Sequence, residues 1–134
     1  MKQAKKIREK IERIEEAYEY MLAYAAQGRA DEGAGADGAQ IRTFINQFNL
    51  SLKELDSLTS DISKEVPDAD DFIDCFKSES KVMGSVLKVL LSRKNLSSEV
   101  IDNTNGLISV RTYLTSLFFI DKVDNYLNEN GIIR

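Results

Sequence analysis

The sequence contains no histidine, and it has only one cysteine and one proline in 134 residues. Histidine is the commonest general base and metal ligand in proteins. Its absence excludes catalytic triads that rely on a histidine base and di-iron sites built on Glu-x-x-His motifs. Cys75 has no second cysteine to pair with, which favours a reducing compartment and therefore a cytoplasmic protein.

The chain also lacks a long apolar run and an excess of positive charge. No stretch approaches the roughly 18 uninterrupted apolar residues of a membrane span. The opening MKQAKK leads into a charged amphipathic pattern rather than an apolar segment, so we expect no secretory signal. The net charge is −4 and the isoelectric point is near 4.9, which argues against nucleic acid as a partner.

What the sequence does contain is a pair of apolar repeats with the spacing of coiled-coil seams. In each repeat the residues recur at alternating steps of three and four, which keeps one side of a helix against its neighbour. The first repeat consists of Ala4, Ile7, Ile11, Ile14, Tyr18, Met21 and Ala25. The second consists of Ile41, Ile45, Phe48, Leu52, Leu55, Thr59 and Ile62.

These patterns predict four helices, at about 4–27, 39–63, 68–94 and 97–127. Gly28 can end the first helix and Pro67 the second, while Asp68 and then Ser97 or Ser98 can cap the starts of the next two. A Gly- and Ala-rich linker at 28–38 is expected to be flexible. Short connections between helices of similar length predict one domain over 1–134, folded as an antiparallel, up-down-up-down four-helix bundle.

The last predicted helix departs from this regular pattern in two ways. Asn105-Gly106 interrupts it, which indicates a kink or a break. Its apolar residues also surround it almost completely. One broad side carries Leu107, Val110, Tyr113, Leu114, Leu117, Phe118 and Ile120, and nearly the opposite side carries Ile108, Phe119 and Tyr126.

A helix of a four-helix bundle keeps one face in water, so Ile108, Phe119 and Tyr126 need cover from outside the bundle. A second copy of the chain or another protein would supply it, and so would the chain's own C-terminal residues. Tyr20 and Tyr24 stand one turn apart, off the first seam, and are a second candidate for a partner-facing patch. The alternative is that both tyrosines cover the bundle's own helix junction.

Polar residues that could perform chemistry are few. Asp121 and Asp124 fall within the apolar arc of the last helix and would need a cation or an arginine as partner; we favour a salt bridge over a metal. Cys75 is expected to be a half-buried, catalytically inert thiol because no histidine can activate it. We therefore predict no catalytic residues, no metal and no cofactor.

The sequence favours a non-enzymatic protein–protein interaction module, such as an adaptor, assembly factor or regulator. It would act as a homodimer through the apolar face of its last helix. The alternative is a bundle that holds a small apolar or metal-containing ligand between its helices. In that case Asp121, Asp124, Arg111 and Cys75 would be the polar lining.

Overall fold

The computed structural model describes the backbone of residues 4–33 and 36–130 and the side chains of residues 5–33 and 40–122. Within these ranges the chain forms helices and no strands, which confirms the all-helical prediction. The last of the four predicted helices is broken after Asn105, at the Asn105-Gly106 interruption where we expected a kink or a break, so the structure has five helices. They are α1 (Ala4–Ala26), α2 (Ala36–Glu65), α3 (Asp70–Ser92), α4 (Ser98–Asn105) and α5 (Ile108–Asn130), with the 3-10 turn η1 (Pro67–Ala69) before α3.

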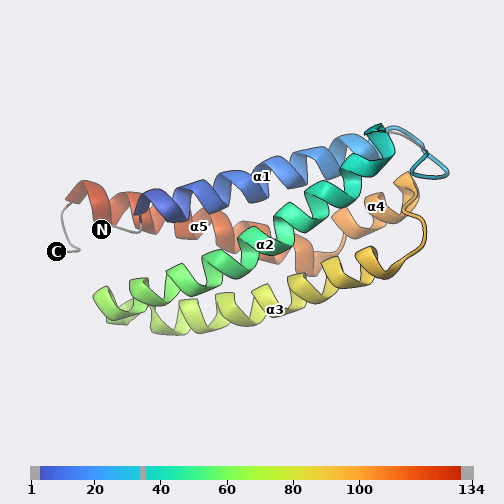
Figure 1. Ribbon diagram of the computed structural model, residues 1–134. Coiled ribbons are helices and arrows are strands. Elements are labelled where there is room, and N and C mark those ends of the chain that lie inside the picture. Colours follow the sequence, from blue (N-terminus) through green and yellow to red (C-terminus); the bar gives the residue numbers. More distant parts are fainter. Residues whose placement is uncertain (1–3, 34–35, 131–134) are drawn as a thin grey trace.

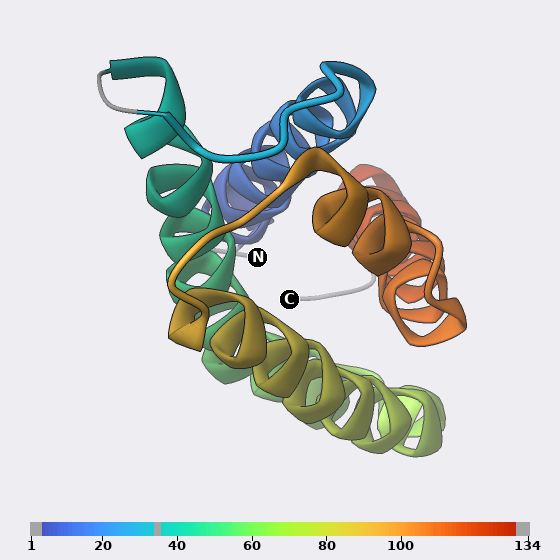
Figure 2. The ribbon, with the colours of Figure 1, turned by 90° about the vertical axis from the view of Figure 1, so that its right-hand side faces the viewer.

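The four long helices lie along one axis, and the short α4 sits at the end where α1 meets α2 (Figure 1). α1 packs against α2, α4 and α5, whereas α3 packs against α2 and α5. Seen from the end, α2 and the α4–α5 pair stand on opposite sides, with α1 and α3 between them (Figure 2). The helices thus enclose one common core.

The two repeats supply much of this core, as their spacing predicts. Every member of the second repeat is buried. In the first repeat Tyr18 and Ala25 are half-buried, the side chain of Ala4 lies outside the described residues, and the other members are buried. The Tyr113 ring of α5 stacks on Phe76 of α3 at 5.3 Å and lies 6.2 Å from Phe48 of α2. Three helices therefore meet around one buried aromatic ring.

The helix ends follow their local chemistry with one exception. Gly28 has a positive φ of 66° after α1, and the Ser97 side chain accepts a 3.2 Å hydrogen bond from the Val100 amide at the start of α4. Asp68 does not cap α3, contrary to our prediction. Pro67, with its fixed φ, begins the turn η1 there, and α3 starts only at Asp70.

The Glu32–Arg42 ion pair anchors the loop between α1 and α2 to helix α2, and both side chains also hydrogen-bond to the α3 end and the α3–α4 loop. The Arg42 guanidinium of α2 donates to both carboxylate oxygens of Glu32, each at 2.8 Å. It also donates to the carbonyl oxygens of Leu91 (3.2 Å) and Arg93 (2.7 Å) at the end of α3. The Glu32 carboxylate in turn accepts from the Leu96 amide at 3.0 Å. One carboxylate therefore links both loops and α2.

Further hydrogen bonds extend this junction toward α1 and α4. The Arg29 amide donates to Ser98 Oγ at 2.8 Å, and the Ser98 amide donates to the Arg29 carbonyl at 2.9 Å. The buried Tyr24 hydroxyl donates to the Leu96 carbonyl at 2.7 Å. The first residues of the 28–38 linker thus make specific bonds to the α3–α4 loop, and α2 begins at Ala36, three residues before the predicted start at 39.

Replacing Arg42 by alanine is expected to lower the free energy of unfolding by about 2 kcal/mol, because it strands a largely buried carboxylate and two helix-end carbonyls. The side chain of Glu32 is only 14% exposed. Urea denaturation followed by circular dichroism measures the loss. Lys64→Ala, which removes a 3.8 Å ion pair of a lysine that is 78% exposed, is the control and should change stability by less than about 0.5 kcal/mol. Equal losses in the two variants would mean that the loop junction does not stabilise the fold.

Candidate functional site

The outward face of α5 carries exposed apolar side chains, at two of the three positions that we predicted. Ile108 is 81% exposed and Phe119 is 52% exposed. The side chain of Tyr126 lies outside the described residues. Phe118, which we assigned to the core side, is also exposed. Since Leu117 points into the core, its neighbour Phe118 lies roughly 100° away around the helix and cannot do so too.

Between Ile108 and Phe119 the same face carries Thr112 and Thr115, both exposed. We name these four residues the α5 seam. Their steps of four, three and four are those of a coiled-coil seam, and none is charged. The Thr115 hydroxyl donates to the Arg111 carbonyl of its own helix at 2.8 Å, which leaves its methyl group for packing. The α5 seam is therefore an uncharged stripe along the outside of the bundle, with a large apolar side chain at each end.

Apolar exposure continues from the start of α5 onto α3. Leu107, which we also expected in the core, belongs to the turn before α5 and is exposed. It lines an open groove of about 330 Å³ together with Val86 and Val89 of α3 and Val100 of α4. At the other end of the seam, the Phe119 ring meets the Phe72 ring edge-on at 4.8 Å.

The two tyrosines predicted as a surface patch lie at the junction of α1 and α2. Tyr24 is fully buried and hydrogen-bonded, so it is not a surface residue, contrary to that prediction. Tyr20 is half-buried and stacks on Phe44 of α2 at 4.4 Å. Their positions correspond to the alternative, in which they cover the bundle's own junction.

The polar residues considered for an internal ligand do not form one site. Asp121 makes a 3.2 Å ion pair with Arg8, the salt bridge that we favoured. Cys75 is exposed on α3 and not half-buried, contrary to our prediction. Arg111 lines a separate hollow between α1 and α4, and the side chain of Asp124 is not among those described. Across the described ranges, no three histidine, cysteine or acidic side chains come close enough together to hold a metal ion.

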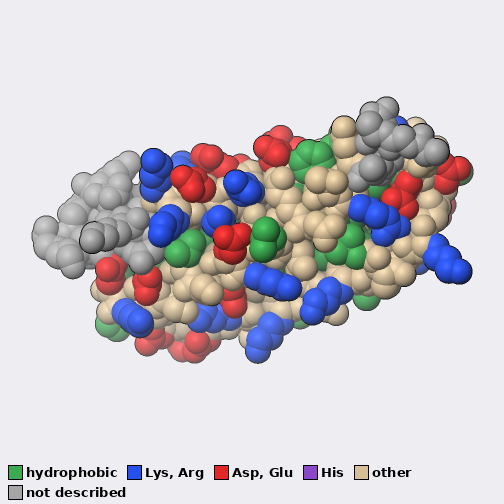
Figure 3. Space-filling view, viewed as in Figure 1, with side chains coloured by type: hydrophobic (Ala, Val, Ile, Leu, Met, Phe, Trp, Pro, Cys, Tyr) green, Lys and Arg blue, Asp and Glu red, His purple; other side chains and the backbone are tan. Residues whose placement is uncertain are grey.

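The sequence reasoning missed a polar groove between α2 and α3. This open groove has a volume of about 310 Å³. Most of its lining residues have polar or charged side chains, although apolar atoms make up the larger part of its surface. The lining residues are Asn49, Leu52, Lys53, Asp56, Ser80, Lys81, Gly84, Ser85 and Lys88. On this face of the molecule, basic side chains lie close together over the middle of the α2–α3 boundary, whereas acidic and basic side chains alternate toward the left of the view (Figure 3).

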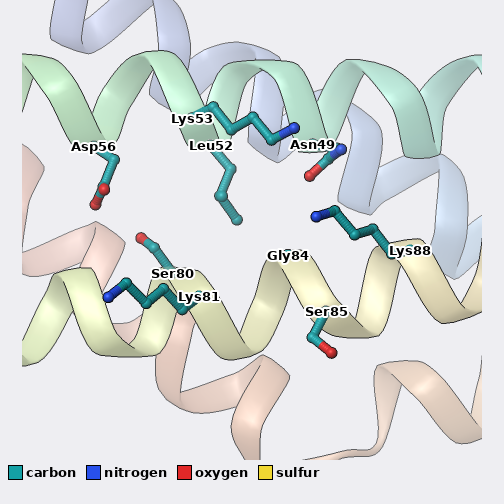
Figure 4. Close-up of a pocket in the computed structure, with 9 residues that line it drawn as sticks. All are labelled: Asn49, Leu52, Lys53, Asp56, Ser80, Lys81, Gly84, Ser85 and Lys88. Carbon is teal, nitrogen blue, oxygen red and sulfur yellow. The ribbon is translucent and has the colours of Figure 1, made fainter.

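The groove has two chemically different ends (Figure 4). At one end, the amines of Lys53 from α2 and Lys88 from α3 point toward the same space beside Asn49. At the other end, Asp56 and Ser80 face each other across the groove, and the amine of Lys81 lies on the same side as this pair. Leu52 and Gly84 separate the two ends.

Several polar atoms at the groove are buried without a hydrogen-bond partner among the described residues: Asn49 Oδ1, Asp56 Oδ1, Ser80 Oγ and, behind them, the Tyr113 hydroxyl. Burial raises the pKa of Asp56, although Lys77, the Ser80 hydroxyl and Lys81 act to lower it. Burial also raises the pKa of Tyr113. Ser80 thus influences both groups without reaching hydrogen-bonding geometry with either.

Gly84 leaves the floor of this groove without a side chain. A Cβ atom placed there would lie 3.9 Å from Asn49 Oδ1 and from Leu52 Cδ2, which is ordinary contact. Packing therefore does not require glycine, although glycine in a helix interior costs about 1 kcal/mol relative to alanine.

A periodic signal for the groove is present in the sequence. Asn49, Lys53 and Asp56 are spaced by four and three on α2. Lys77, Lys81, Gly84 and Lys88 are spaced by four, three and four on α3. Two facing polar stripes with this period place polar side chains along a shared helix boundary.

No protein-family model matches the chain, and comparison with curated proteins and with solved structures finds no significant match. In the part of the chain that the structure describes, none of the helices combines the length and the apolar character needed to cross a membrane.

Asp56→Asn is expected to stabilise the protein near neutral pH, because the raised pKa means that the folded state disfavours the ionised carboxyl. The penalty is absent when Asp56 is protonated in both the folded and unfolded states, and it appears as the pH rises through the folded-state pKa. The stability gain of the variant should thus shrink as the pH falls toward and below 3.8, the ordinary aspartate value.

Urea denaturation of the native protein and of the Asp56→Asn variant, from neutral pH down to below 3.8, measures the difference in their free energies of unfolding. The pKa of Glu15 is also raised, by burial and by nearby Asp121, but Glu15 is common to the two proteins and its effect cancels. If the stability gain of Asp56→Asn grew as the pH fell, the result would contradict a raised pKa of Asp56 in the folded state.

Proposed function

We propose that this protein is a non-enzymatic interaction module that forms a homodimer through the α5 seam. The observation that carries the proposal is an exposed, uncharged stripe with coiled-coil spacing, ended by Ile108 and Phe119. Exposed apolar surface of this kind is typical of association sites. Covering it with a second helix would supply the desolvation energy for association.

The order of residues along the seam suits a twofold symmetric contact. In an antiparallel pair of α5 helices, Ile108 of one copy would lie opposite Phe119 of the other, with Thr112 opposite Thr115. Each large side chain then meets a large one and each small side chain a small one, which is the self-complementarity that a twofold interface requires. Arg111, exposed beside the seam, and Lys122, exposed at the next seam position after Phe119, would supply charges that limit other registers.

A second candidate function is binding of a small apolar ligand beside Phe119. A cavity of about 320 Å³ lies there between α2, η1, α3 and α5. Its lining is almost entirely apolar: Ile62, Val66, Asp68, Ala69, Phe72, Ile73, Phe119 and Ile120. Such a ligand would rest on side chains of the bundle and would need no metal.

Ile108→Glu is expected to weaken the dimer at least roughly tenfold, because it places a charge in the desolvated seam. Ile108 is 81% exposed, so the variant should fold normally, as circular dichroism will verify. Native mass spectrometry and light scattering measure the assembly state. Leu50→Glu, at a position on α2 that is 58% exposed, is the matched control and should leave the dimer intact.

The same mass spectra separate the two candidate functions. A native protein that is monomeric at micromolar concentration and carries no added mass would contradict both. A monomer with a bound small molecule would favour the apolar cavity. Phe119→Glu should then release that molecule, whereas Ile108→Glu should not.

A further inference from the structure

We propose that the groove between α2 and α3 binds a small phosphorylated molecule that also carries hydroxyl groups. The proposal rests on the two-ended lining of the groove and on its buried polar atoms that lack partners. It concerns a surface distinct from the α5 seam and does not depend on dimerisation.

The lysine end of the groove supplies the anion-binding half of the site. Lys53 and Lys88 approach the same space from opposite walls, and neither forms an ion pair within the described residues (Figure 4). Their amines are compact point charges, which suit a tetrahedral phosphate, whereas planar carboxylates are matched better by arginine. The lining contains no arginine. Its only acidic residue, Asp56, lies at the far end.

The far end supplies hydrogen-bond acceptors for the rest of the molecule. Asp56 Oδ1 and Ser80 Oγ are buried there and lack partners in the described protein. Asp56 lines the groove, so a hydroxyl group of a ligand seated there would donate a hydrogen bond to its carboxylate. A site with such acceptors favours a molecule that offers donors over one that lacks them.

The middle of the groove sets the size of the ligand. Leu52 projects from the α2 wall, and Gly84 leaves the α3 wall flat opposite it. The groove volume of about 310 Å³ is at the lower limit for ligand pockets and suits a three- to six-carbon phosphate ester. Packing in α3 does not require glycine at position 84, and the absence of a side chain there enlarges the groove.

The test is a calorimetric titration with three probes: glycerol 3-phosphate, inorganic phosphate and glycerol. Glycerol 3-phosphate should bind in a saturable manner with one molecule per chain, inorganic phosphate should bind more weakly, and glycerol should not bind at millimolar concentration. The Lys53→Gln/Lys88→Gln double variant should weaken glycerol 3-phosphate binding at least roughly tenfold, because each lysine contributes a charge-assisted contact. Lys64→Gln, an exposed lysine of α2 outside the groove, is the control and should have no effect.

Two further variants separate the halves of the site. Asp56→Asn should weaken glycerol 3-phosphate binding and leave the affinity for inorganic phosphate unchanged. Gly84→Ala should keep the fold, as circular dichroism will verify, and weaken binding by narrowing the groove. The proposal is overturned if none of the probes gives saturable binding, or if Lys64→Gln weakens binding as much as the double variant does. Inorganic phosphate that binds as tightly as glycerol 3-phosphate would overturn the assignment of the hydroxyl-binding half.

Discussion

The carboxylate of Glu32 is the constraint on which the arrangement of this bundle depends. It receives Arg42 from α2 and the backbone amide of Leu96 from the α3–α4 loop, while Arg42 also holds the last carbonyls of α3. Apolar burial is non-directional, so polar contacts specify the relative position of the helices more sharply than burial alone does. The charge-assisted hydrogen bonds of Glu32 and Arg42, at the end of the bundle that holds α4, are directional. They fix the position of α3 and α4 along the bundle axis relative to α1 and α2. The core beneath them can then pack in one register.

Much of the fold could be predicted because the buried side of each helix repeats in the sequence. Ile41 to Ile62 form one buried seam, and Gly28 and Ser97 end and begin helices by local chemistry. Phe118 was misassigned because an apolar side chain at the edge of a helix face is buried or exposed according to the angle of its neighbour. The Glu32–Arg42 pair escaped prediction for another reason: its residues join segments that are distant in the sequence, and no local pattern reports such a contact.

Of the two candidate sites, the α5 seam could be predicted from the sequence and the groove between α2 and α3 could not. Ile108 and Phe119 were found because apolar residues outside the main stripe are conspicuous in a helix. The groove was overlooked because lysines and an aspartate on a helix normally indicate a solvated surface. Only the structure shows that polar atoms of Asp56 and Ser80 are buried at the α2–α3 boundary and that Gly84 leaves space beside Asn49 and Leu52. Helix α3 contributes to two grooves. Its valines Val86 and Val89 line the apolar groove beside Leu107, and its lysines Lys81 and Lys88 line the groove shared with α2.

Cys75 combines two properties that are useful together: it is the only sulfhydryl in the sequence, and it is exposed on α3. Cys75 precedes Val82 and Val89 at intervals of seven, so it lies on the same stripe of that helix as these exposed valines. A maleimide fluorophore or nitroxide would therefore attach at one position without any engineered cysteine. The natural chain thus carries its own labelling point for spectroscopic measurement of distances between copies.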